Sequence, residues 1–278
     1  MSSKPDNLSI TALYTAQTWS WGGFDCAQLL ETRQGRGVFN TANLALGLAR
    51  LLRPGLPSLP CSLVQRHAMI DHLLAASGSS QVLELAAGLS RRGAAFSRDP
   101  AIQYVEVDLP PMVEQKRTLL ARSEQGLAVL NRSNLRMIGA DIASVDLDSL
   151  VKPGRSLMVI AEGLLMYLKA EEQRQLWRRV SRLIRRVPRG VFLFDLVPAC
   201  ELPPSGWIGR ALGAAFKQAT GGRSFETDKR TRQDILRELQ ECGFGRVATF
   251  EPQQVGEDWQ LPHSQTRTQA LIFQCQAR

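Results

Sequence analysis

The stretch Gln81-Val-Leu-Glu-Leu-Ala-Ala-Gly-Leu-Ser90 decides the fold. Its first five residues have the pattern of a buried strand, and the small residues that follow form a turn into a helix. Similar strand and helix units follow along the chain, with further strands predicted at 102–108, 135–138, 157–161, 191–194, 246–250 and 270–275. This alternation predicts an α/β fold with a doubly wound, mainly parallel, seven-stranded sheet.

The first eighty residues differ from the rest of the chain. Residues 10–21, 39–52 and 62–77 have the apolar spacing of helices. We therefore predict an N-terminal helical cap over 1–80 and a core domain over 81–278. Within the core, the Pro- and Gly-rich segment 198–227 follows the fifth strand and carries an apolar helix at about 207–216. It is predicted to be a lid over the substrate pocket, and packing into the core is the alternative interpretation.

The composition narrows the classes of function. The 278-residue chain is 44% hydrophobic with a net charge of +8, and its sequence has no run of apolar residues long enough to span a membrane. Five scattered cysteines without a CxxC pair argue against a disulfide framework and against structural zinc. The polar first ten residues do not have the layout of a secretory signal. We expect a cytoplasmic protein without a metal, and the sequence leaves its oligomeric state open.

An arginine-rich helix is predicted to follow the fourth strand. Its arginines, from Arg174 to Arg189, alternate with apolar residues such as Leu176 and Leu183 at helical spacing. This pattern is typical of a surface helix with one buried face and one solvated face. Contact with a nucleic acid is the alternative interpretation of the basic face.

Acidic residues stand at the ends of three neighbouring predicted strands. Asp108 lies twenty residues after Gly88, Asp141 follows the third strand, and Glu162 follows the fourth. An acid at the position of Asp108 accepts hydrogen bonds from ribose hydroxyls in nucleotide-binding sheets. The turn lacks a full GxGxxG pattern, so a phosphate-bearing dinucleotide is poorly supported. The ordered acids suit a ligand with a ribose, an adenine and a cation, and S-adenosylmethionine is such a ligand.

Four blocks of sequence resemble one known family. They are Val82-Leu-Glu-Leu-Ala-Ala-Gly-Leu-Ser-Arg-Arg-Gly93, Tyr104-Val-Glu-Val-Asp-Leu-Pro110 with Lys116, Gly139-Ala-Asp141, and Ile160-Ala-Glu-Gly-Leu-Leu-Met-Tyr-Leu168. Together they resemble the leucine carboxyl methyltransferase family, and within it the bacterial branch of polyketide O-methyltransferases related to the tetracenomycin enzyme. The resemblance covers about residues 66–194 and implies the class I methyltransferase fold and S-adenosylmethionine as cofactor.

The resemblance also implies roles for individual residues. Arg66 would hold the methionine carboxylate, Glu162 would face the methionine amino group, and Asp108 would bind the ribose. Tyr167 would lie near the methyl donor. The other cofactor-binding positions in the matched blocks are Glu84, Ala86, Gly88, Leu109, Asp141 and Ile142. Ala86 departs from the family, which usually has a glycine at this place in the turn.

The expected reaction is methyl transfer to oxygen, with S-adenosylhomocysteine as the second product. A carboxylate acceptor needs no base, whereas a hydroxyl gains about 10²–10⁴-fold from one. Of the three histidines, His263 is the one expected to reach the acceptor. Because no obvious base stands out, a carboxylate is favoured. The expected acceptor is an apolar small molecule with a carboxyl or hydroxyl group. The alternatives are a nucleic-acid methyltransferase and a methyltransferase-like binding protein without activity.

Overall fold

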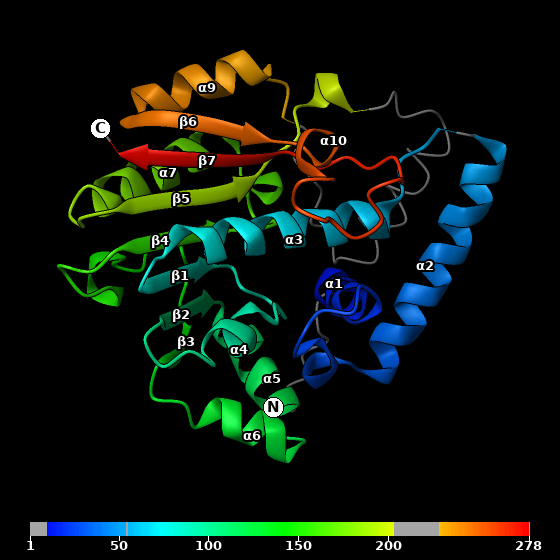
Figure 1. Cartoon of the computed structure of the whole chain (residues 1–278), viewed down its shortest axis with the longest axis horizontal. Helices are drawn as coiled ribbons and strands as arrows, with labels where there is room; N and C mark the ends of the chain where they lie inside the picture. Colours follow the sequence, from blue (N-terminus) through cyan, green and yellow to red (C-terminus); the bar gives the residue numbers. More distant parts are fainter. Residues whose placement is uncertain (1–9, 54, 203–227, 278) are drawn as a thin grey trace, which may run out of the picture.

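The computed structural model describes residues 10–53, 55–202 and 228–277. Its centre is one seven-stranded sheet with the strand order β3-β2-β1-β4-β5-β7-β6 (Figure 1). The strands are β1 (Gln81–Leu85), β2 (Gln103–Asp108), β3 (Leu135–Gly139), β4 (Leu157–Ala161), β5 (Gly190–Asp195), β6 (Phe244–Phe250) and β7 (Ile272–Ala277). The first five strands are parallel to one another, and β7 pairs antiparallel with both β5 and β6. The predicted fold class is confirmed.

The strand order reverses between β1 and β4, where the chain moves from one half of the sheet to the other. In open parallel sheets, ligands bind beyond the carboxyl ends of the strands at such a reversal. The strands at this place read as nearly continuous apolar runs because both faces of the sheet are covered. All residues of β1 and β4 are buried.

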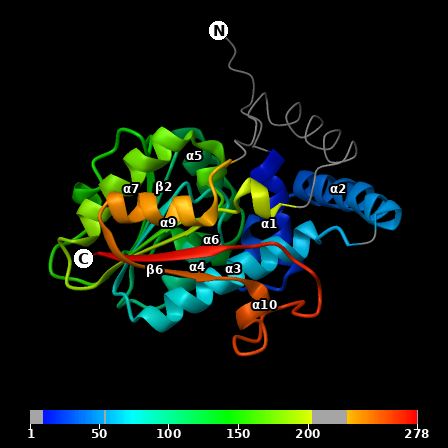
Figure 2. The same cartoon turned by 90° about the horizontal axis from the view of Figure 1, so that it is seen from above.

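Helices cover the sheet on both faces and enclose two cores (Figure 2). On one face, α7 (Ala170–Ile184) and α9 (Arg232–Glu241) pack with the strands around Trp177 and Phe194. On the other, α3 (Leu59–Ser77), α4 (Arg92–Phe96), α5 (Pro110–Leu120) and α6 (Glu124–Leu130) enclose the second core. The apolar residues of the arginine-rich helix, α7, therefore face the sheet, and its arginines lie on the outer side.

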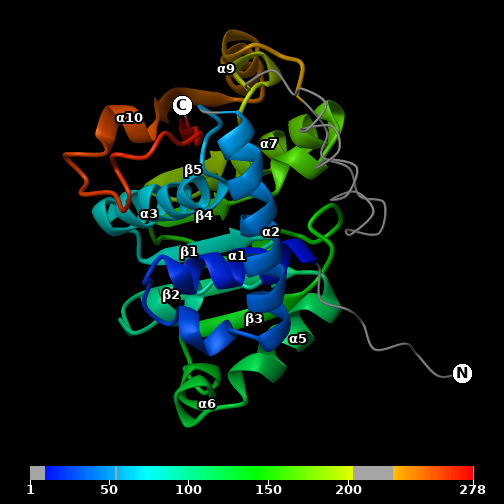
Figure 3. The ribbon, with the colours of Figure 1, turned by 90° about the vertical axis from the view of Figure 1, so that its right-hand side faces the viewer.

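Two N-terminal helices, α1 (Ile10–Trp21) and α2 (Arg33–Leu52), pack against each other at the end of the sheet to which the parallel strands point (Figures 1 and 3). The third N-terminal helix, α3, lies on the sheet itself and contributes Met69 and Ile70 to the second core. The connection from β6 to β7 contains α10 (Pro252–Val255) and packs against α3.

Side-chain caps fix the first residues of two helices. The second helix begins at Arg33 rather than at residue 39 because the Thr32 hydroxyl accepts the Gly35 N–H at 2.8 Å. The helix α9 begins at Arg232 because Thr231 and Asp234 form a capping box. The predicted helix at 207–216 and most of the predicted lid lie outside the described residues.

Candidate functional site

A large cavity opens at the carboxyl ends of the strands. Its volume is about 1160 Å³, above the range of about 300–1,000 Å³ that is usual for the pocket of one small ligand. The strand ends β1, β2, β4 and β5 supply Glu84, Asp108, Glu162 and Asp195 to its lining. The helices α1 and α3 and the segment after β5 add mainly apolar side chains, among them Leu59, Leu63, Leu196, Val197 and Leu202. The cavity therefore has one acidic region and one apolar region.

The turn after β1 and the end of β2 form one hydrogen-bonded unit. The Gly88 N–H donates to Oδ2 of Asp108 at 2.6 Å, and the Leu109 N–H donates to Oδ1 at 2.7 Å. Burial raises the pKa of Asp108, although both N–H groups favour the ionised form. Each carboxylate oxygen accepts one backbone bond and retains capacity for another. Asp108 can thus accept hydrogen bonds from two neighbouring hydroxyls, as the ribose assignment requires.

The turn has an unusual backbone at the position where the family prefers glycine. Ala86 has φ of 52°, and Gly88 has φ of 51°. Residues with a Cβ atom rarely adopt this left-handed conformation, which costs about 1–2 kcal/mol. Both residues line the cavity. The bend brings the backbone of the turn to the ligand side of the sheet.

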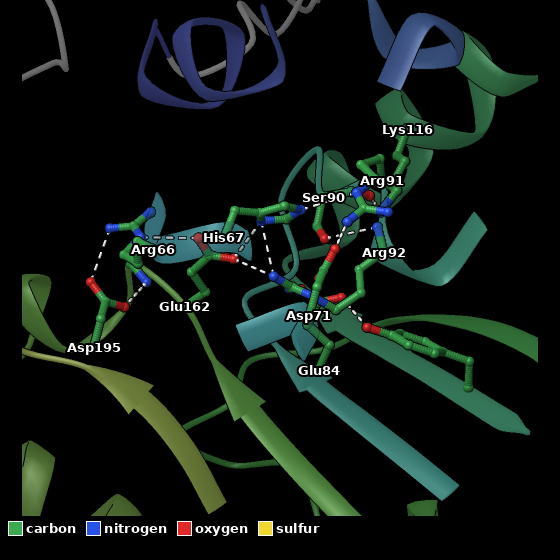
Figure 4. Close-up of polar contacts among 12 residues, drawn as sticks. Arg66, His67, Asp71, Glu84, Ser90, Arg91, Arg92, Lys116, Glu162 and Asp195 are labelled. Atoms are coloured by element: carbon green, nitrogen blue, oxygen red, sulfur yellow. Dashed lines mark hydrogen bonds and ion pairs between the residues drawn. The ribbon is translucent and has the colours of Figure 1, made fainter. Parts of the chain in front are cut away.

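Glu162 lies at the centre of a buried polar network (Figure 4). Oε1 accepts from Arg66 Nε at 2.9 Å, and Oε2 lies 2.8 Å from both His67 Nδ1 and Arg92 Nη2. Burial opposes ionisation of the carboxyl, but His67, Arg92 and Arg66 outweigh it and hold the pKa of Glu162 well below its ordinary value. The side chain of Glu162 is thus a fixed anion at the cavity wall.

His67 is neutral, and its contacts define its tautomer. Arg91 Nε lies 3.1 Å from His67 Nε2, and a guanidinium nitrogen can only donate. Arg92 Nη2 also lies 2.9 Å from Nδ1, but Nδ1 has an acceptor in Glu162 Oε2 at 2.8 Å. We therefore place the imidazole proton on Nδ1, from which it is donated to Glu162. Burial and the Arg92 guanidinium lower the pKa of His67 well below its ordinary value. The ring also stacks on Trp19 at a centroid distance of 4.0 Å, so His67 orients Glu162 and does not serve as a base.

Behind Glu162, the network continues away from the cavity through Arg92. This fully buried arginine donates to Glu84 at 2.5 Å and to Asp71 at 2.7 Å. The other oxygen of Glu84 accepts from the Tyr104 hydroxyl at 2.7 Å. Arg91 pairs with Asp71 and lies over the Phe24 ring. Glu84 lines the cavity, but its carboxylate is engaged in holding β1, β2 and α4 together.

Asp195, the last residue of β5, completes the acidic wall and was missed by the sequence analysis. Oδ2 accepts from Arg66 Nη1 at 2.9 Å, and Oδ1 accepts the Gly163 N–H at 2.5 Å. Burial raises the pKa of this carboxyl, and Arg66 opposes the rise. The signal for Asp195 was its place at the carboxyl end of a parallel strand, the same signal that singled out Asp108.

The other predicted residues fall into two groups. Asp141, Ile142, Leu109 and Tyr167 line the same cavity as Arg66 and Glu162. His263 does not belong to the described lining: its ring stacks on Trp21 at 4.8 Å, and its carbonyl accepts from Gln65 at 2.8 Å. The β6–β7 connection that carries His263 packs against α3, and its expected contact with the acceptor stays a prediction.

The basic face of α7 is partly engaged within the protein. Arg174 pairs with Glu171 at 2.8 Å, Arg186 pairs with Asp148 at 3.0 Å, and Arg185 donates to the Gly243 carbonyl. Arg179 reaches the cavity wall and donates to the carbonyl of Ala143 at 3.0 Å. These contacts give the arginines a role in the fold that requires no nucleic acid.

The described residues offer neither a cluster of metal ligands nor a membrane-spanning helix. Within 10–53, 55–202 and 228–277, no three side chains of the metal-binding types come together in a way that could hold an ion. Over the same residues, no helix combines the length and the apolar character needed to cross a membrane.

Known proteins of similar sequence match a large part of the chain. The profile of the leucine carboxyl methyltransferase family matches residues 26–181, more than half of the chain. The tetracenomycin polyketide synthesis O-methyltransferase TcmP of Streptomyces glaucescens is 32% identical over 157 residues, which cover 55% of this chain and 54% of that protein. A Mycobacterium avium protein named "Putative S-adenosyl-L-methionine-dependent methyltransferase" is 29% identical over 211 residues, or 70% of this chain and 64% of that protein. The matches therefore cover less than two thirds of the length of these relatives.

A solved structure supports the fold. The crystal structure of "a putative O-methyltransferase" from Nostoc punctiforme superposes with a TM-score of 0.52 at 14% identity, over 96% of this chain and 72% of that one. At this identity the likeness concerns the arrangement of strands and helices alone.

Proposed function

Because the chain belongs to the leucine carboxyl methyltransferase family, whose members use S-adenosylmethionine, we propose that its cavity binds this cofactor and that the protein methylates an oxygen atom of a small secondary metabolite. The observation that carries the proposal is the meeting of Asp108, Arg66, Glu162 and Asp195 in one cavity at the strand reversal.

The residues present fit this cofactor better than a dinucleotide. The acidic wall favours a ligand with positive groups, and S-adenosylmethionine carries a sulfonium and an ammonium. A pyrophosphate would be repelled by the same carboxylates. In the proposed arrangement, Asp108 accepts from the ribose, the turn with Ala86 and Gly88 approaches the nucleoside, and Leu109, Asp141 and Ile142 border the adenine. Arg66 binds the methionine carboxylate, and Glu162 fixes the orientation of Arg66 through its Nε bond.

When bound, the cofactor supplies an electrophilic methyl group. The contribution of the chain is to hold the acceptor oxygen about 3–3.5 Å from that methyl, in line with the bond that breaks. The apolar region of the cavity excludes water and suits an apolar acceptor, with Tyr167 as a border residue. Tyr14 also lines this cavity, and its hydroxyl donates to Asn43 at 2.9 Å. Burial raises the pKa of Tyr14, so its phenol does not serve as a base near neutrality.

The positions and protonation states of the histidines favour one kind of acceptor group. His67 is held neutral with its Nε2 occupied by Arg91, and His263 lies outside the described lining. A carboxylate oxygen is already ionised and requires no proton transfer, so we propose a carboxylate as the preferred acceptor and a hydroxyl as the second choice.

Methyl transfer to a panel of aromatic carboxylic acids and phenols tests the proposal. The purified protein is incubated with methyl-labelled S-adenosylmethionine and each compound, and labelled products are treated with mild alkali. A methyl ester is cleaved by alkali and a methyl ether is not, so the treatment identifies the acceptor group. We expect labelled esters. Label in ethers alone would refute the carboxylate assignment, and absence of S-adenosylhomocysteine binding would refute the cofactor assignment.

A further inference from the structure

The buried network has more carboxylates than guanidinium groups. The cationic members are Arg66, Arg91 and Arg92, and the anionic members are Asp71, Glu84, Glu162 and Asp195. His67 adds no charge because its contact with Arg91 requires the neutral form. Lys116 and Glu106 form a separate buried pair, at 2.7 Å. The network thus retains one uncompensated negative charge.

The excess charge is located at the cavity end of the network. Arg91 pairs with Asp71, and Arg92 pairs with Asp71, Glu84 and Glu162. Among the described residues, Arg66 is the guanidinium that pairs with Asp195, and it also pairs with Glu162. The side chain of Asp195 is 5% exposed, so water can supply little of the missing compensation.

The two carboxylates at this end differ in how well they are satisfied. Glu162 contacts three side chains, two of them cationic, whereas Asp195 accepts from one guanidinium and one backbone N–H. The pKa of Glu162 is lowered despite burial, and that of Asp195 is raised because burial prevails over Arg66. An added cation would therefore stabilise the ionised form of Asp195 more than that of Glu162.

Arg66 and Asp195 together match the head group of an amino acid. Arg66 uses Nε for Glu162 and Nη1 for Asp195, and within the described part of the chain its Nη2 has no hydrogen-bond partner. Nη2 lies on the side of Gly163, which also borders the cavity. A ligand carboxylate at Nη2 and a ligand ammonium at Asp195 would each contact a group of opposite charge. Figure 4 shows the side chains of Arg66 and Asp195 next to each other.

We propose that Asp195 binds the ammonium group of the amino-acid moiety of the cofactor, and that Glu162 is a positioning residue that orients Arg66. This inference rests on the proposed function. It differs from the family resemblance, which implies that Glu162 faces the amino group. The ammonium gives Asp195 a second cationic partner, while the carboxylate of the same moiety pairs with Arg66. Glu162 already has three side-chain partners, whereas Asp195 has one side chain and one backbone N–H.

Two ligands that differ only in the ammonium group test the proposal. They are S-adenosylhomocysteine and its desamino analogue, which retains the carboxylate, and calorimetric titration near neutral pH measures their dissociation constants. A hydrogen bond between charged groups contributes about 1.5–3 kcal/mol, so we expect the wild type to prefer S-adenosylhomocysteine at least tenfold. In Asp195→Asn this preference should fall to about threefold or less, mainly through weaker binding of S-adenosylhomocysteine.

Asp228→Asn is the matched control. Asp228 also lines the cavity, and its side chain is 5% exposed like that of Asp195, but it has its own partner in Arg230. We expect this variant to retain the wild-type preference. If Asp195→Asn does not fold, Asp195→Glu keeps the charge and displaces it by one methylene, and it should reduce the same preference.

Each contrary outcome has a separate meaning. Equal binding of the two ligands by the wild type would overturn the inference without any variant. Equal loss of both ligands in Asp195→Asn would show that the residue only supports the fold. If Glu162→Gln loses the preference for S-adenosylhomocysteine and Asp195→Asn retains it, Glu162 and not Asp195 binds the ammonium. If the wild type binds neither ligand and transfers no methyl group, the proposed function itself fails.

Discussion

Replacement of Asp108 by asparagine should weaken binding of S-adenosylhomocysteine by about 10–150-fold. The two carboxylate oxygens accept the Gly88 and Leu109 N–H groups at 2.6 and 2.7 Å and, as proposed, the two ribose hydroxyls. Asparagine offers one acceptor oxygen and one NH₂ donor, so at least one charge-assisted bond to the ribose is lost. Such a bond contributes about 1.5–3 kcal/mol, and each 1.4 kcal/mol is about tenfold in the dissociation constant.

Calorimetric titration of the wild type and of Asp108→Asn measures this loss. Asp99→Asn is the matched control, because Asp99 also accepts a backbone N–H, that of Ala101 at 2.8 Å, but lies outside the described lining of the cavity. The control should bind like the wild type. The asparagine at 108 also leaves one backbone donor poorly satisfied, which lowers the free energy of unfolding by about 1–3 kcal/mol. A folded Asp108→Asn protein that binds within about threefold of the wild type would refute the ribose assignment.

Three further predictions concern stability. Ala86→Gly relieves the left-handed backbone and should change the free energy of unfolding, measured by chemical denaturation, by about 0 to +1 kcal/mol. Ala87→Gly, at an ordinary φ, should lower it by about 0.5–1 kcal/mol. A larger loss of stability in Ala86→Gly than in Ala87→Gly would contradict backbone strain at residue 86. Burial raises the pKa of Glu106 to about 7 from 4.5, so the folded state binds more protons between these values and stability falls as pH rises through them. The double variant Glu106→Gln, Lys116→Met should lose this pH dependence of the free energy of unfolding, measured by urea titrations at ~pH 5 and ~pH 7.5. If the double variant differs from the wild type by the same free energy at both pH values, the raised pKa of Glu106 is contradicted. The lowered pKa of His67 acts in the opposite direction, because the unfolded state gains the proton below its ordinary value of 6.5 and stability is lost as pH falls. His67→Asn should abolish this loss. If the free energy of unfolding of the variant falls with decreasing pH as it does in the wild type, His67 is not a neutral buried histidine.

The strands were predictable because their residues carry the signal themselves. Residues 81–85 and 157–161 are apolar along most of their length, and the structure places strands with these bounds. Asp108 and Glu162 were predicted from the same local pattern, since each stands at the carboxyl end of a recognisable strand. The boundary at residue 80 between a cap and a core stays a prediction, and α3 on the cap side of it packs directly on the sheet.

Long-range pairing was not predictable from local patterns. Asp195 carries the local signal of a strand end, but its pairing with Arg66, 129 positions away, and with the Gly163 N–H of another strand end is not contained in that signal. The neutral state of His67 likewise depends on its burial and on the guanidinium groups of Arg92 and Arg91, which local patterns do not bring to the ring. His263 was expected near the acceptor from chain direction alone, and the direction in which a loop returns depends on packing that the sequence pattern does not contain.

The central claim, that the cavity at the strand ends is an S-adenosyl nucleoside site, is tested most directly by thermal unfolding with added ligand. S-adenosylhomocysteine at 100 times its dissociation constant should stabilise the wild type by about 2.7 kcal/mol. NAD, which carries the same adenosine with a pyrophosphate, should give little stabilisation because of the acidic wall. An unchanged unfolding temperature with S-adenosylhomocysteine, or equal stabilisation by NAD, would contradict the claim.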